Sequence, residues 1–173
     1  MMDETEFWQL IDSSREAAEG DPEEQADALV ERLVALDPDS VVDFARHFES
    51  RDSRAYTWDL WAAAGILLGG ASDDAFDNFR SWLIGQGREV FEGALHDPDH
   101  LADLLDAFDD EVDGDAEELG YAADEAYEQL TGAEMPDLGL PPQPREPLGT
   151  YLDLDDDRVL AERFPQLWDR YGT

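Results

Sequence analysis

Residues 58–68 read WDLWAAAGILL, and this stretch determines the fold class. A helix with this sequence is apolar almost all round, with Asp59 as its one charged residue, so it must be buried on most sides. Gly69 and Gly70 end the helix, and Ser72 is placed to cap a following one. We therefore expect this helix to be surrounded by other elements of the fold.

Those other elements are predicted to be helices. Asp3 is placed to cap a first helix, because apolar residues at helical spacing follow it. Three further starts have a capping Asp followed by Pro and then apolar residues at helical spacing: Asp21-Pro22, Asp37-Pro38 and Asp97-Pro98. No segment shows convincing strand alternation, and no internal repeat is present. The sequence predicts an all-α fold, a compact single-domain bundle of about seven to nine helices.

The chain is predicted to form one domain in three parts, because its 173 residues fit the usual length of a single domain. Residues 1–130 form the helical core, which ends with a helix at about 116–130. Residues 131–150 form a Pro-rich strap packed on the core, because 135–148 contain five prolines with interspersed leucines. Residues 151–173 form short C-terminal helices of the same domain.

The charge balance restricts the possible partners. The chain has 45 Asp and Glu against 11 basic residues, all of them Arg, and a formal net charge of −34. Such a chain repels nucleic-acid phosphates and anionic lipids, so we expect no direct nucleic-acid binding and no membrane association, but attraction to a basic protein partner. A high-salt organism, or a genome that disfavours Lys codons, would give a similar composition.

The chain has no cysteine, which excludes disulfides and thiolate chemistry. Its first residues are acidic, unlike a signal peptide, and its longest apolar stretch, 61–70, is shorter than the ~20 residues of a membrane span. We expect a cytoplasmic protein. No motif indicates a cofactor or a catalytic residue, and the oligomeric state is left open.

The candidate ligand-binding residues surround two charges in the apolar centre, Asp59 and Arg80. Burying either charge alone is costly, so an Asp59–Arg80 pair is the simplest prediction, with Asp77 and Asp73 as competing partners for Arg80. The pair is either a structural salt bridge or part of an aromatic-walled pocket for a small ligand. The candidate pocket residues are Trp58, Asp59, Trp61, Arg80, Trp82 and Gln86.

A second acidic pattern resembles the start of an EF-hand calcium loop. Its carboxylates are Asp109, Glu111, Asp113, Asp115 and Glu117. The twelfth position, which should carry a bidentate Glu, is Gly120, so these residues are weak metal candidates and we expect no metal site.

Three stretches resemble a bacterial family of unknown function, DUF4240: residues 56–64 (YTWDLWAAA), 69–76 (GGASDDAF) and 79–88 (FRSWLIGQGR). The opening Phe7-Trp8 is also similar to the start of that family, and the resemblance covers roughly residues 3–130. It implies a cytoplasmic, actinobacterial protein. It transfers no activity and no binding residues.

Two classes of function follow. The leading hypothesis is a non-enzymatic acidic interaction or regulatory protein that binds a basic protein partner, with a nucleic-acid mimic or an immunity-type inhibitor as variants. The alternative is a small-molecule binder or enzyme that uses a Trp, Asp and Arg pocket around Asp59 and Arg80.

Added salt is expected to stabilise the fold. Between Arg88 and Arg145 the chain carries 18 acidic residues and no Lys or Arg, so like-charge repulsion is strong there. Raising NaCl from about 10 to 500 mM shortens the Debye length several-fold, and the melting temperature should rise. A flat melting temperature across that range would show that the acidic stretch contributes little to the cooperative unfolding.

Overall fold

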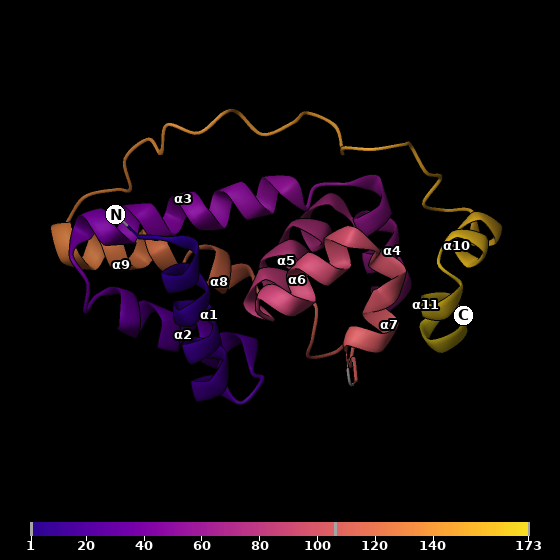
Figure 1. The fold of residues 1–173 in the computed structure, drawn as a ribbon, viewed down its shortest axis with the longest axis horizontal. Coiled ribbons are helices and arrows are strands. Elements are labelled where there is room, and N and C mark those ends of the chain that lie inside the picture. Colours follow the sequence, from indigo (N-terminus) through magenta and orange to yellow (C-terminus); the bar gives the residue numbers. More distant parts are fainter. Residues whose placement is uncertain (1, 106, 173) are drawn as a thin grey trace.

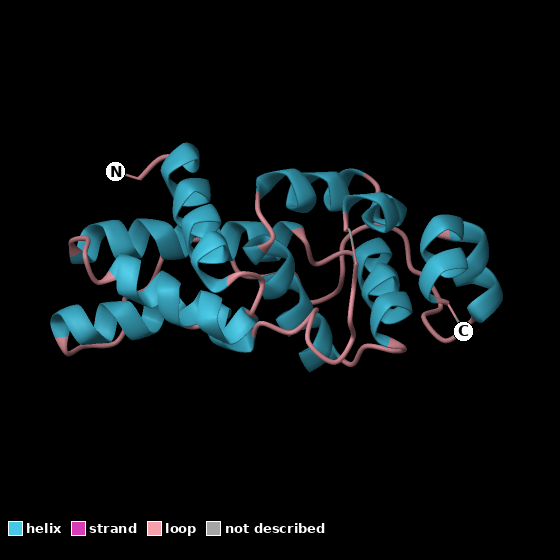
Figure 2. Ribbon diagram, turned by 90° about the horizontal axis from the view of Figure 1, so that it is seen from below, coloured by secondary structure: helices cyan, strands magenta, loops and turns pink. Residues whose placement is uncertain are grey.

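A computed structural model describes residues 2–105 and 107–172, and this part of the chain contains helices and loops but no strand (Figure 2). The predicted all-α class is confirmed. The elements are α1 (Glu4–Ala18), α2 (Pro22–Leu33), α3 (Pro38–Arg54), α4 (Trp58–Leu68), α5 (Asp73–Gly85), α6 (Arg88–His96), the 3-10 helix η1 (Pro98–His100), α7 (Leu101–Leu104), α8 (Glu117–Gly120), α9 (Ala122–Thr131), α10 (Asp157–Arg163) and α11 (Pro165–Tyr171).

The described residues contain eleven α-helices, more than the seven to nine that the sequence predicts. The difference comes from α7 and α8, which are single turns of four residues. The helix expected at about 116–130 is divided at Tyr121, which lies between α8 and α9.

The predicted helix starts have the expected caps. The carboxylates of Asp3, Asp21 and Asp37 accept hydrogen bonds from backbone N–H groups in the first turns of α1, α2 and α3. Thr57 Oγ1 accepts from the Leu60 N–H at the start of α4, and Ser72 caps α5. Each cap satisfies N–H groups that have no partner within their own helix.

The helices form an elongated body (Figure 1). One half contains α1, α2, α8, α9 and the start of α3, and the other contains α4, α5, α6 and α7. The C-terminal helices α10 and α11 lie at the end beyond α4, and α11 packs against α4. The hydrophobic core is continuous from Phe7 of α1 to Leu167 of α11.

The Pro-rich segment crosses the molecule along the outer side of α3, from the end of α9 towards α10 (Figure 1). Arg46 Nε of α3 donates to the Leu138 carbonyl at 2.9 Å. Farther along, the Leu148 N–H donates to the Tyr56 carbonyl at 2.8 Å, and the Trp58 N–H donates to the Leu148 carbonyl at 3.1 Å. The Leu148 side chain is exposed, so the backbone of this residue docks and its side chain does not.

Two helical glycines differ in their surroundings and give a paired test. A Cβ on Gly85 of α5 would lie 2.7 Å from Leu119 Cδ2, whereas a Cβ on Gly65 of α4 would meet nothing within 4 Å. We expect Gly65→Ala to raise the free energy of unfolding by up to about 1 kcal/mol, the helix-propensity gain. Gly85→Ala should lower it by about 1–3 kcal/mol through overpacking. Urea unfolding of both variants measures this, and shifts of the same sign would contradict it.

Candidate functional site

Arg80 of α5 is buried, with a side chain 6% exposed. Its Nε donates to Asp52 Oδ1 at 3.1 Å and its Nη2 donates to Asp77 Oδ1 at 3.0 Å. Asp52 comes from α3 and is itself only 9% exposed, so this ion pair joins two helices inside the fold. The predicted competitor Asp77 does bind Arg80, but it is mostly exposed.

Two aromatic rings and the Pro-rich strap enclose this ion pair. The guanidinium carbon of Arg80 lies 4.7 Å from the Tyr56 ring centroid and 4.6 Å from that of Phe76, both within cation–π range. The second carboxylate oxygen of Asp52 accepts a hydrogen bond from Gln143 Nε2 of the strap at 3.0 Å. Both buried charges are therefore partnered, which fits a structural role for Arg80.

The predicted Asp59–Arg80 pair is wrong. Asp59 instead binds Arg163 of α10 in a bidentate pair, with Arg163 Nε and Nη2 each 3.1 Å from a carboxylate oxygen. Asp59 is 36% exposed, and its partner comes from a C-terminal helix and not from α5. This exposed pair links α4 to α10.

The other candidates divide into two groups. Trp58 stacks on Trp61 at 5.8 Å, and Trp61 stacks on Phe76 at 5.1 Å, so an aromatic column leads from the surface to the buried Arg80. Trp82 packs against Phe79 and Phe108 instead.

Gln86 is also separate from the column, because its Nε2 donates to the Trp82 carbonyl, at 3.5 Å. The structure thus brings Trp58, Trp61 and Arg80 together and leaves Trp82 and Gln86 outside that group.

The true partner of Arg80 had a signal in the sequence. The apolar stripe Val41, Phe44, Ala45 and Phe48 of α3 is followed four residues later by Asp52, which lies on the same helical face and is buried with it. By contrast, Arg163 is 104 residues from Asp59 and no local pattern connects them.

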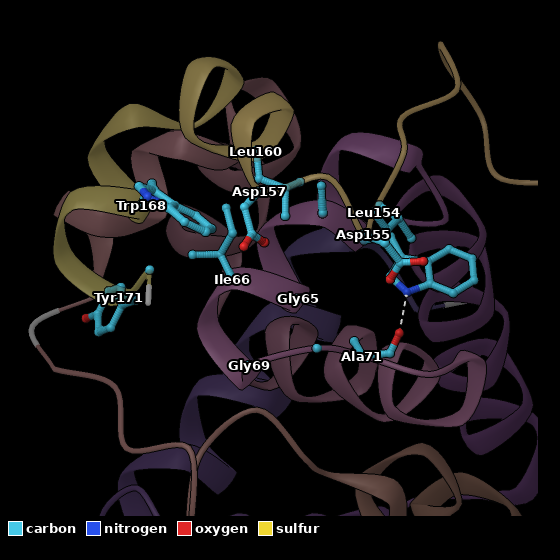
Figure 3. A pocket seen from close by; sticks show the side chains of 14 residues that line it. Gly65, Ile66, Gly69, Ala71, Leu154, Asp155, Asp157, Leu160, Trp168 and Tyr171 are labelled. Carbon is cyan, nitrogen blue, oxygen red and sulfur yellow. Dashed lines mark hydrogen bonds between the residues drawn. The ribbon is translucent and has the colours of Figure 1, made fainter.

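A cavity of about 250 Å³ lies between α4 and the C-terminal helices, and we call it the α4 cavity (Figure 3). Its apolar wall includes Trp61, Gly65 and Ile66 of α4, Leu160 of α10 and Trp168 of α11. Asp155 and Asp157 supply two carboxylates. Of the predicted pocket residues, only Trp61 lines this cavity.

The weak calcium candidates form turns. Asp109 Oδ1 accepts from the Glu111 N–H, Asp113 Oδ2 from the Asp109 N–H and Asp115 Oδ1 from the Glu117 N–H. Within residues 2–105 and 107–172, no group of three or more His, Asp or Glu side chains is arranged to hold a metal ion.

The fold and this cluster define an all-α protein with a buried arginine at its centre. Residues 2–129 match the family described as "Protein of unknown function (DUF4240)", and the chain belongs to this family. Comparisons with curated proteins and with solved structures give no match. Across the described residues, no helix is long and apolar enough to cross a membrane.

Loss of the Arg80 side chain should destabilise the fold strongly. Arg80→Ala leaves the buried Asp52 carboxylate without its cation, which should cost roughly 3–5 kcal/mol in free energy of unfolding. Arg145→Ala serves as the control, because Arg145 is exposed on the strap. Denaturant unfolding measures both, and small, equal effects would mean that the Arg80 ion pair is not needed for stability.

Beside this ion pair lies a small group of carboxyls with raised pKa values. Burial raises the pKa of Glu49, and the negative charge of Asp52 adds to the rise. Partial desolvation also raises the pKa of Asp77, although this side chain is mostly exposed and Arg80 opposes the rise. The pKa of Asp124 is raised by burial as well. These groups cost stability when they are ionised.

Glu49→Gln should therefore stabilise the protein in a pH-dependent way. A raised folded-state pKa means that ionised Glu49 destabilises the fold at pH values above that pKa, and that this cost vanishes as the pH falls below the unfolded-state pKa. The variant should melt at a higher temperature than the wild type at pH 8, with a smaller difference near pH 4. Glu31→Gln, on the exposed side of α2, controls for the loss of one charge. An equal gain in both variants at every pH would contradict the assignment.

Proposed function

We propose that this protein is a non-enzymatic acidic interaction protein that binds a basic protein partner. The proposal rests on the observation that most of the few arginine side chains are engaged in ion pairs within the protein. Among the described residues, at least six of the eleven Arg side chains lie in ion pairs within the fold: Arg46, Arg51, Arg54, Arg80, Arg88 and Arg163. The large excess of carboxylates therefore faces solvent without neutralisation, and it attracts a positively charged surface.

A depression lined by acidic residues lies between the start of α2 and residues 111–118, and we call it the acidic hollow. It has a volume of about 470 Å³, and no basic side chain lines it. Its carboxylates are all exposed and come from Asp21, Glu23, Glu111, Asp115, Glu117 and Glu118. Six carboxylates around a depression suit the Arg or Lys side chains of a partner, because charge complementarity speeds association and favours specific partners.

The pairing of the candidate charges also favours this class over the small-molecule or enzyme alternative around Asp59 and Arg80. Arg80 is closed off by Asp52, two rings and Gln143, and Asp59 is held by Arg163. In the part of the chain that the structure describes, neither charge lines the α4 cavity or the acidic hollow. The cytoplasm as the compartment and an actinobacterial source belong to the same proposal.

Capture of partners from the native cytosol at two salt concentrations tests the proposal. The wild-type protein should capture a basic protein at about 50 mM salt and lose it at about 200 mM, because salt screens attraction between exposed charges. A hollow variant (Glu111→Gln, Asp115→Asn and Glu118→Gln) should lose this partner already at 50 mM.

A matched control removes the same three charges at the opposite end of the molecule, by Glu146→Gln, Glu162→Gln and Asp169→Asn. This control should retain the partner. Capture of no basic protein by the wild type, or equal capture by the two variants, would overturn the proposal.

A further inference from the structure

The α4 cavity combines features of a ligand site that the proposed function does not use. It lies at the seam between α4 and the C-terminal helices, and it is concave, partly apolar and acidic (Figure 3). We propose that it binds a short aliphatic diamine in its doubly protonated form.

The floor of the cavity is open because Gly65 has no side chain. Gly65 lies in the middle of α4, and a Cβ there would meet no atom within 4 Å. Ile66 and Leu160 provide apolar surface beside it. This arrangement leaves room for a chain of methylene groups, which lose contact with water when they lie against these side chains.

The charges of the cavity select a cation. Among the described residues, the carboxylates of Asp155 and Asp157 form neither a hydrogen bond nor an ion pair, and no basic side chain lines the cavity. The nearby Asp59, by contrast, is neutralised by Arg163. Two unpaired carboxylates match two ammonium groups.

The two carboxylates lie apart, which favours a ligand with a charge at each end. In Figure 3, Asp157 lies beside Ile66, whereas Asp155 lies near Leu154. The methylene chain of a diamine would then run over the floor between them.

Two tryptophans line the cavity. Trp61 stacks against Trp58 and Phe76, and its Nε1 donates to the Ala71 carbonyl at 2.9 Å. Gly172 packs against the indole ring of Trp168, so both tryptophans contribute apolar wall and the two ammonium groups are bound by the carboxylates.

Calorimetric titration of the full chain with 1,4-diaminobutane at constant ionic strength tests the proposal. The diamine should bind at one site, at least about tenfold more tightly than butylamine, because each carboxylate adds a charge-assisted hydrogen bond. Magnesium chloride should give no comparable one-site binding. Equal binding of magnesium or of butylamine would show general condensation of cations on an acidic surface, and would overturn the proposal.

Variants locate the binding. Gly65→Leu should abolish the binding of 1,4-diaminobutane by filling the floor, and Asp157→Asn should weaken it about tenfold. Glu162→Gln, an exposed residue of α10 outside the cavity wall, removes the same charge and should leave the affinity within about twofold of the wild type. If Gly65→Leu fails to fold, the comparison of Asp157→Asn with Glu162→Gln decides the test. Wild-type affinity in Asp157→Asn would overturn the proposal.

The test is independent of the proposed protein partner. The hollow variant described above leaves the α4 cavity intact, so it should bind the diamine as the wild type does. Loss of diamine binding in the hollow variant would overturn the assignment to the α4 cavity, whatever the result of the partner capture.

Discussion

The Arg80 guanidinium joins three segments that are distant in sequence. It reaches α3 through Asp52 and lies on α5, and Asp52 in turn binds the strap through Gln143. In a chain with 45 acidic residues and 11 Arg, any carboxylate could compete for this cation. The aromatic rings of Tyr56 and Phe76 favour this cation at the buried position, because both lie within cation–π range of the guanidinium while its donors reach Asp52 and Asp77. The angle between α3 and α5 depends on this contact.

Much of the fold was predictable because helix starts obey local rules. Capping side chains act within three residues of their position, so the starts of α1, α2, α3 and α5 could be identified from Asp3, Asp21, Asp37 and Ser72. The division between α8 and α9 was missed, because Ala and Leu continue the helical pattern through Tyr121. Docking of the strap through the Leu148 backbone was also missed, because no side-chain pattern encodes it.

For the candidate site, the sequence could predict which charge is buried with a partner, but not which residue is the partner. A charged residue on an apolar helix face must be buried with a partner, so a paired Arg80 was foreseeable, but the identity of its partner depends on how α3 and α5 pack. The α4 cavity shows the same limit. Asp155 and Asp157 belong to an acidic run in the sequence, and only the docking of α10 and α11 against α4 brings them into the wall of one cavity with Gly65.

The route of the strap has a consequence for how the C-terminal helices stay attached. Residues 132–156 connect α9 at one end of the body to α10 at the other, and they are fastened along α3 and at Tyr56. The docking of α10 and α11 on α4 is therefore an intramolecular event, governed by an effective concentration and not by the protein concentration. Because the strap is held along its length, the free tether is much shorter than 25 residues, and the local concentration of the C-terminal helices at α4 is correspondingly high. Even a modest intrinsic affinity of Trp168 and Leu167 for that surface is then enough to keep this end of the molecule closed.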